Sequence, residues 1–142
     1  MLLPSTEVVS QITLANKRDI WRAERQQKKQ LRIRTVTSDA IVSYRVEQLC
    51  LPPDVIKKLG LKRVARRKAR TSQGIERVSI YGPVSLSLGD RFATVDAVEL
   101  ATTNQILLGW ITLSTLQLQV DSNSQTLVDM PPDYAAWARN DD

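Results

Sequence analysis

Few residues in this chain belong to the types that carry out covalent or metal chemistry. The sequence has no histidine, which removes the commonest metal ligand and the commonest general base. Its single cysteine, Cys50, cannot form an internal disulfide. These absences exclude zinc sites and histidine-activated nucleophiles, and we expect neither a metal nor another cofactor. Cys50 lies between Leu49 and Leu51, which predicts a buried, small hydrophobic side chain.

Charge is distributed unevenly along the chain. Residues 1–70 hold 17 Lys and Arg against 6 Asp and Glu, whereas residues 71–142 hold 3 against 9, and the net charge is +5. The cations concentrate in residues 17–34 and 57–70, and such runs can neutralise nucleic-acid phosphates. Aromatic residues make up only 5% of the chain, and Trp21 is the only one within either basic run, so a series of stacking platforms for single strands is missing. We therefore favour two solvated loops, which would complement the acidic half of a neighbouring subunit.

Length and composition indicate one soluble domain. The chain has 142 residues, of which 42% are hydrophobic and 25% charged. Its longest uncharged apolar run, residues 106–111, is far shorter than the roughly 20 residues that a membrane-spanning helix needs. The first residues lack the basic flank and apolar core of a secretory signal, so we expect a reduced, cytoplasmic protein.

The elements that must position any site are mostly strands. Strand composition recurs in residues 7–14, 32–46, 78–81, 84–88, 92–100 and 116–120. Residues 84–88 alternate between apolar and polar, as a strand with one solvent-exposed face does. Residues 106–108 predict a buried strand that ends at Gly109. Turns are expected at Gly74, at residues 82–83 and at residues 88–90.

Helical signals are short. Residues 51–60 predict a helix of about two turns: they carry prolines and Asp54 at the start, lysines in the last turn and Gly60 at the left-handed cap position. Residues 111–116 form a second helical turn in this prediction, and residues 15–31, around Trp21, form a long loop or a frayed helix. The fold class predicted is therefore all-β, with one or two short helices in a single small barrel or sandwich.

Two segments together carry a resemblance to a known family. The first runs from Ala40 through Leu-Cys-Leu-Pro at residues 49–52 to Leu-Gly-Leu at residues 59–61. The second is Ile-Leu-Leu-Gly at residues 106–109, followed by Asp121 and Leu127. In this order and spacing they resemble the retroviral-like (retropepsin-type) aspartic proteases, specifically the compact bacterial ones. The resemblance implies a small closed β-barrel over residues 7–131, an N-terminal extension of residues 1–6 and an acidic tail of residues 132–142.

The chain departs from that family at the chemistry. Aligned on residues 49–52, the family's Asp-Thr-Gly falls on Ser43, Tyr44 and Arg45, and the resemblance implies that each subunit of a homodimer would give one Asp. That mechanism needs two close carboxylates that share a proton, which serine cannot replace. Asp39 is four residues away and lacks a neighbouring glycine, so it is an unsuitable replacement. Glu47 would have to neutralise Arg45 near the twofold axis of such a dimer, within or across subunits.

The remaining positions carried over from the family concern binding. Gly74 falls on the tip of the flap, the hairpin that closes over an extended peptide, and Leu107, Leu108 and Gly109 fall on the psi-loop. Cations flank this flap, which suits an acidic segment added as a further strand. Two aromatic residues of the acidic tail are candidate docking anchors. The predicted interaction residues are Arg63, Arg66, Arg67, Lys68, Arg70, Tyr134 and Trp137.

These observations favour a catalytically inactive retropepsin-like homologue that serves as a protein–protein interaction or assembly subunit. Its partner would be a protein or an acidic peptide segment, or a second copy of the chain in a homodimer. Two alternatives stay open. One is an active peptidase with an unrecognised catalytic group, such as a lysine that activates Ser43. The other is a nucleic-acid-binding module that uses residues 57–70.

Overall fold

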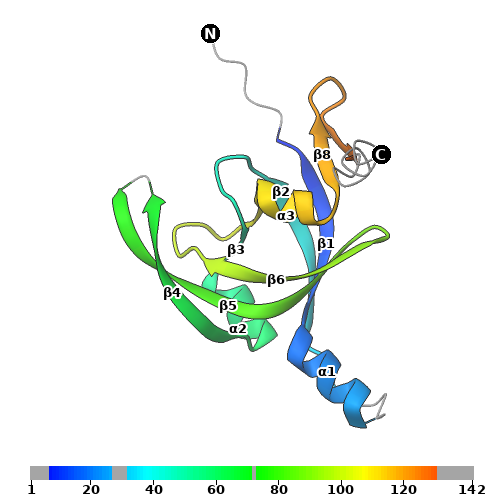
Figure 1. Ribbon diagram of the computed structural model, residues 1–142, viewed down its shortest axis with the longest axis vertical. Coiled ribbons are helices and arrows are strands. Elements are labelled where there is room, and N and C mark those ends of the chain that lie inside the picture. Colours follow the sequence, from blue (N-terminus) through cyan, green and yellow to red (C-terminus); the bar gives the residue numbers. More distant parts are fainter. Residues whose placement is uncertain (1–6, 27–31, 72, 131–142) are drawn as a thin grey trace, which may run out of the picture.

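The computed structural model describes residues 7–26, 32–71 and 73–130, which form a closed six-stranded β-barrel (Figure 1). The barrel order is β1-β2-β7-β3-β6-β5, and β1 closes it by pairing with β5. The strands are β1 (Val9–Asn16), β2 (Thr35–Val42), β3 (Leu49–Leu51), β5 (Gly74–Leu88), β6 (Arg91–Glu99) and β7 (Ile106–Leu108). The predicted mostly-β, single-domain closed barrel is confirmed.

Three more strands lie outside the closed ring. β4 (Lys62–Thr71) extends the sheet beyond β5, and β8 (Leu118–Asp121) pairs with β9 (Thr126–Asp129) in a separate hairpin. β4 and β5 form a long hairpin that reaches out from the barrel wall (Figure 1). β4 is the last strand in the sheet order, so one of its two edges has no strand partner among the described residues.

Alternating apolar side chains fill the barrel. In β5, Val84 and Leu86 are fully buried, whereas the serines between and after them lie on the other face of the strand. They pack with leucines and isoleucines of the other strands and of the helices, so a single core holds the domain together. The largest fully buried side chains include Ile12, Leu14, Leu49, Leu51, Leu59, Leu86, Leu108 and Leu113.

Three short helices complete the described structure: α1 (Lys17–Gln26), α2 (Pro53–Leu59) and α3 (Trp110–Thr115). α2 lies within the segment of residues 51–60 that was predicted to hold a short helix. Gly60 follows it in the left-handed conformation, with φ +64°, and its N–H closes the helix on backbone carbonyls. α3 confirms the predicted helical turn, although it begins one residue earlier than expected.

The solvated loop expected for the second basic run is wrong for residues 62–70, which lie in β4, the strand that pairs with β5 over its full length. Residues 57–58 close α2, as the helix prediction expected. Part of the first run forms α1, in agreement with the predicted alternative of a helix within residues 15–31. Its buried anchor, described below, orders a segment that has little apolar content of its own. Backbone pairing and one buried contact therefore override the local composition.

Two further strand predictions are corrected. Residues 82–83 were expected to form a turn, but β5 continues through them, and the pairing register shifts there as at a β-bulge. Residues 43–46 were expected to continue a strand, but β2 ends at Val42 and a turn follows. Among the described residues, no helix is long and apolar enough to cross a membrane.

Candidate functional site

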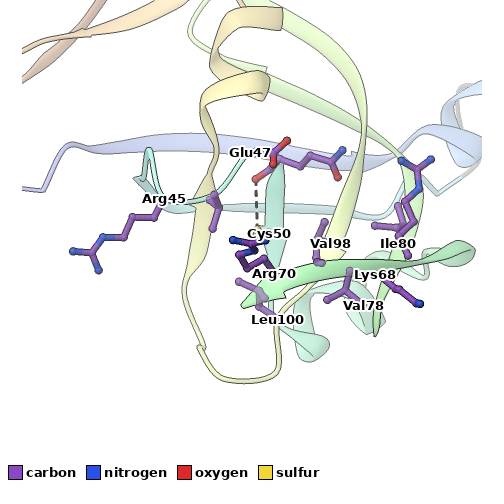
Figure 2. A pocket seen from close by; sticks show the side chains of 13 residues that line it. Arg45, Glu47, Cys50, Lys68, Arg70, Val78, Ile80, Val98 and Leu100 are labelled. Carbon is purple, nitrogen blue, oxygen red and sulfur yellow. Dashed lines mark hydrogen bonds between the residues drawn. The ribbon is translucent and has the colours of Figure 1, made fainter. Parts of the chain in front are cut away.

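A cavity of about 370 Å³ lies between the turn after β2 and the β4–β5 hairpin (Figure 2). Its apolar lining comes from Cys50, Val78, Ile80, Val98 and Leu100. Around these residues, Arg45, Glu47 and Gln48 come from the turn, and Arg67, Lys68 and Arg70 come from β4. Four cationic side chains and one carboxylate therefore line an apolar hollow, a composition suited to an anionic, partly apolar ligand.

Ser43, Tyr44 and Arg45, the three positions that the sequence alignment compared with a catalytic motif, lie in the turn beside this cavity. The Ser43 N–H donates to the Leu108 carbonyl at 3.0 Å, and the Ser43 hydroxyl oxygen accepts the Arg45 N–H at 3.3 Å. The Tyr44 hydroxyl accepts the N–H of Val120 at 3.2 Å, which ties the turn to the β8–β9 hairpin. The side chains of Ser43 and Tyr44 therefore stabilise the turn, whereas Arg45 contributes its backbone N–H.

The predicted psi-loop residues are brought directly against this turn. Leu107 and Leu108 lie in β7, which runs between β2 and β3, parallel to the first and antiparallel to the second. Gly109 follows, and a methyl group at its Cα would lie 2.3 Å from the carbonyl carbon of Glu47. Only a residue without a side chain allows this approach.

The start of α3 completes the link between β7 and the turn. The Trp110 N–H donates to the Val46 carbonyl at 3.2 Å, and the Ile111 N–H donates to the Glu47 carbonyl at 2.8 Å. The first backbone N–H groups of a helix have no partners within the helix, so these contacts satisfy two of them. These backbone contacts hold the turn against the start of α3, in addition to the side-chain contact of Tyr44 with β8.

A second cavity, of about 500 Å³, lies on the other side of the same turn. Its lining includes Glu7, Ser43, Tyr44, Arg45 and Val120. Each cavity has one glutamate in its lining, so within one chain neither holds the close pair of carboxylates that proton sharing requires. Among the ion pairs of the described residues, the expected Arg45–Glu47 pair does not occur within the chain.

Cys50 lies in the apolar lining of the first cavity and is only 3% exposed, so the predicted burial is confirmed. Its thiol donates a long hydrogen bond to the Gln48 carbonyl at 3.5 Å, drawn as a dashed line in Figure 2. Burial raises the pKa of the thiol to about 11. Because the thiolate is the nucleophilic form, Cys50 is unreactive at neutral pH.

Gly74 lies at the tip of the β4–β5 hairpin, opposite Thr71, with φ +111°, and an added Cβ at this position would meet nothing within 4 Å. The strand register puts Arg66, Lys68 and Arg70 on one face of this hairpin, where Arg77 of β5 is directly opposite Lys68. We call these four exposed residues the basic face. Like charges directly opposite each other destabilise a sheet by about 0.2–1 kcal/mol, a cost that an anionic partner would relieve.

The predicted interaction residues are only partly brought together. Arg63, Arg66, Arg67, Lys68 and Arg70 all lie exposed in β4, and none takes part in an ion pair within the part of the chain that the structure describes. Tyr134 and Trp137 lie outside the described residues.

A buried polar cluster at the base of α1 was not predicted from the sequence. Asp19 is 4% exposed and receives a two-pronged contact from Arg34, whose Nε and Nη2 lie 2.8 and 2.9 Å from its carboxylate oxygens. The Arg34 side chain holds the pKa of Asp19 below its usual range, although burial opposes this. Asn16 caps the helix by accepting the Asp19 N–H, and its amide donates to the Leu59 carbonyl at 2.8 Å. An Asn three residues before an Asp is the capping signal that would have indicated this helix.

No protein-family model matches this chain, and no curated protein matches it. Within the described residues, no group of three or more His, Cys, Asp or Glu side chains is arranged to hold a metal ion.

Proposed function

We propose that this chain is a retropepsin-like domain without the catalytic aspartate, and that it binds an extended acidic segment of a partner protein along the β4–β5 hairpin. The observation that carries the proposal is the position of the basic run. Residues 62–71 form the edge strand of the sheet, and three of the four residues of the basic face project from this strand.

An edge strand binds through its backbone. Its outward N–H and C=O groups can pair with an added strand, which is the recognition mode known as β-augmentation. The same cations repel strands of like charge, so they protect the edge from unselective pairing and favour an acidic segment. An added strand on β4 would lie beside the first cavity, whose apolar lining can receive a hydrophobic side chain.

The test uses the full chain and a fluorescent ten-residue peptide of alternating Glu and Val, followed by fluorescence anisotropy. We expect binding that weakens with salt, and no binding of the same peptide with Lys in place of Glu. A third peptide keeps the glutamates but carries N-methyl groups at alternate backbone positions. It should also fail to bind, because it cannot complete the strand pairing.

The matched variants carry the same change in charge on different elements. The β4 variant combines Arg66→Glu, Lys68→Glu and Arg70→Glu, and the α1 variant combines Arg18→Glu, Arg22→Glu and Arg25→Glu. We expect the β4 variant to lose at least tenfold in affinity for the acidic peptide while its thermal stability stays nearly unchanged. The α1 variant should bind the peptide as the unmodified chain does. Equal losses in both variants would overturn the proposal.

The proposed peptide site lies within one chain, whereas the family's catalytic site needs two. Binding of the acidic peptide by a species that light scattering shows to be monomeric therefore agrees with the proposal. Peptide binding that occurs only at concentrations where the chain dimerises would instead indicate a composite cleft between two subunits.

A further inference from the structure

α1 leaves the end of the barrel at which α2 lies and extends away from the barrel (Figure 1). A helix of ten residues is marginal in isolation, so its order must come from its anchor. Asp19 is its only buried residue and contacts Arg34, and the cap residue Asn16 bonds to the carbonyls of Leu59 and Gly60 at the end of α2. This polar anchor fixes a helix that contributes almost nothing to the core.

The outward face of α1 is basic. Arg18, Arg22 and Arg25 follow at intervals of four and three residues, which places them on one side of the helix, and Trp21 lies between them. All four side chains are exposed, Trp21 by 45%. Asp19 lies on the flank of this face, three residues before Arg22, and its side chain is buried against Arg34. We call Arg18, Trp21, Arg22 and Arg25 the α1 face.

The α1 face has no carboxylate within it, and its charges are largely uncompensated. Arg22 is 3.8 Å from Asp19, a distance at the limit of an ion pair, and Asp19 is already engaged by Arg34. In the described part of the chain, no ion pair includes Arg18 or Arg25. Exposed lysines at positions 57 and 58, beside the anchor of α1, add to the positive charge of this end.

We infer that the α1 face binds double-stranded DNA, with the helix in the major groove and its arginines on the phosphates. A helix with its side chains is about 10–12 Å across, and the major groove of B-form DNA is about 12 Å wide. Among the described residues, the one carboxylate within ion-pair distance of this row of cations is that of Asp19, which Arg34 already engages, and such a row suits a partner of uniform negative charge. The deep, narrow major groove of an RNA duplex does not admit the helix, and one apolar residue on the face is too few for insertion into a membrane.

The test measures binding of the full chain to a labelled 24-base-pair DNA duplex by fluorescence anisotropy between 50 and 200 mM salt. Three phosphate contacts contribute about −2.7 to the slope of log affinity against log salt concentration. This slope corresponds to about a 40-fold loss of affinity between 50 and 200 mM salt. The variant Arg18→Gln, Arg22→Gln, Arg25→Gln should show a slope shallower by about that amount. The control variant Arg66→Gln, Lys68→Gln, Arg70→Gln loses the same charge and should keep the slope of the unmodified chain. Circular dichroism confirms that both variants are folded.

Several outcomes would overturn the inference. One is the absence of binding to the duplex at 50 mM salt, and another is an unchanged slope in the α1 variant. If the salt dependence became equally shallow in the β4 control, the DNA contact would lie on the basic run of residues 57–70 and not on the α1 face. Equal or tighter binding of an RNA duplex of the same length would refute docking in the major groove, as would binding of phosphatidylserine vesicles but not of DNA. None of these results depends on the acidic peptide, so the inference and the proposed function fail separately.

Discussion

Replacing Gly109 with alanine tests how tightly the turn after β2 is held. The new methyl carbon would lie 2.3 Å from the carbonyl carbon of Glu47 and 2.5 Å from the backbone nitrogen of Gln48. Neither atom can rotate away, so β7 and the turn must separate. Gly109 has φ −80°, a value that alanine adopts freely, and the whole effect is therefore steric.

Overpacking of this kind costs typically 1–3 kcal/mol, and we expect about 3 kcal/mol here because only backbone atoms are in the way. For a domain of this size the loss lowers the Tm by about 10 °C. The matched control is Gly89→Ala, where φ is +61° and nothing lies within 4 Å of the added carbon. The Gly89→Ala variant should lose only about 1 kcal/mol of stability, because alanine has to adopt the left-handed conformation there.

The assay is urea unfolding followed by circular dichroism, with thermal unfolding beside it. Gly109→Ala should be clearly less stable than Gly89→Ala, with an unchanged dependence on urea. If only backbone conformation mattered, Gly89→Ala would be the less stable of the two variants, because only Gly89 has a positive φ. A Gly109→Ala protein as stable as the unmodified chain would refute the close approach of β7 to the turn.

Three further predictions concern the Asp19–Arg34 contact, the Cys50 thiol and the turn after β2. Asp19→Asn should cost about 2 kcal/mol, since it leaves the Arg34 guanidinium without its charged partner. The pKa of Asp19 is lowered in the folded state. Its contribution to stability is therefore present above the unfolded pKa of about 4 and is lost as pH falls through the folded pKa. Urea titrations between pH 7 and pH 2 should show this loss of stability in the unmodified chain but not in Asp19→Asn. Cys50, with its pKa raised to about 11, should react with iodoacetamide at pH 8 only after unfolding, and rapid labelling of the folded chain would contradict its burial. The triple variant Ser43→Asp, Tyr44→Thr, Arg45→Gly should gain weak, pepstatin-sensitive peptide cleavage if it dimerises; an inactive but folded dimer would mean that the cleft has diverged beyond these residues.

The sequence predicted the elements whose signals are local. α2 carries its proline start and glycine cap within ten residues, and residues 84–88 alternate so clearly that one face must be buried. β7 was predictable because it is wholly apolar and ends at Gly109. In each case the nearest neighbours in the chain determine the structure.

The elements that were missed depend on distant contacts. β4 is rich in cations and has few β-branched residues, and it is a strand because β5 offers it a partner from Lys62 to Thr71. α1 depends on a contact between Asp19 and Arg34, fifteen residues apart, and on a bond from Asn16 to the end of α2. Neither pairing can be deduced from the composition of its own segment.

The residues of the candidate site were predicted in part, whereas their arrangement in space was not. The motif spacing placed Ser43 and Gly109 at positions that do come together, because β7 lies between β2 and β3. The basic residues of β4 were identified, but their arrangement on one face required the strand register. The second cavity was not predicted, since its lining combines four separate parts of the chain.

Amide hydrogen exchange in the presence of the Glu-Val peptide tests the central proposal most directly. Addition of a strand at the free edge of β4 should slow exchange at alternate amides between Lys62 and Thr71, the ones that do not bond to β5, and should leave α1 unchanged. The N-methylated peptide should produce no such protection. Peptide binding that leaves every β4 amide exchanging at its original rate would contradict the proposal.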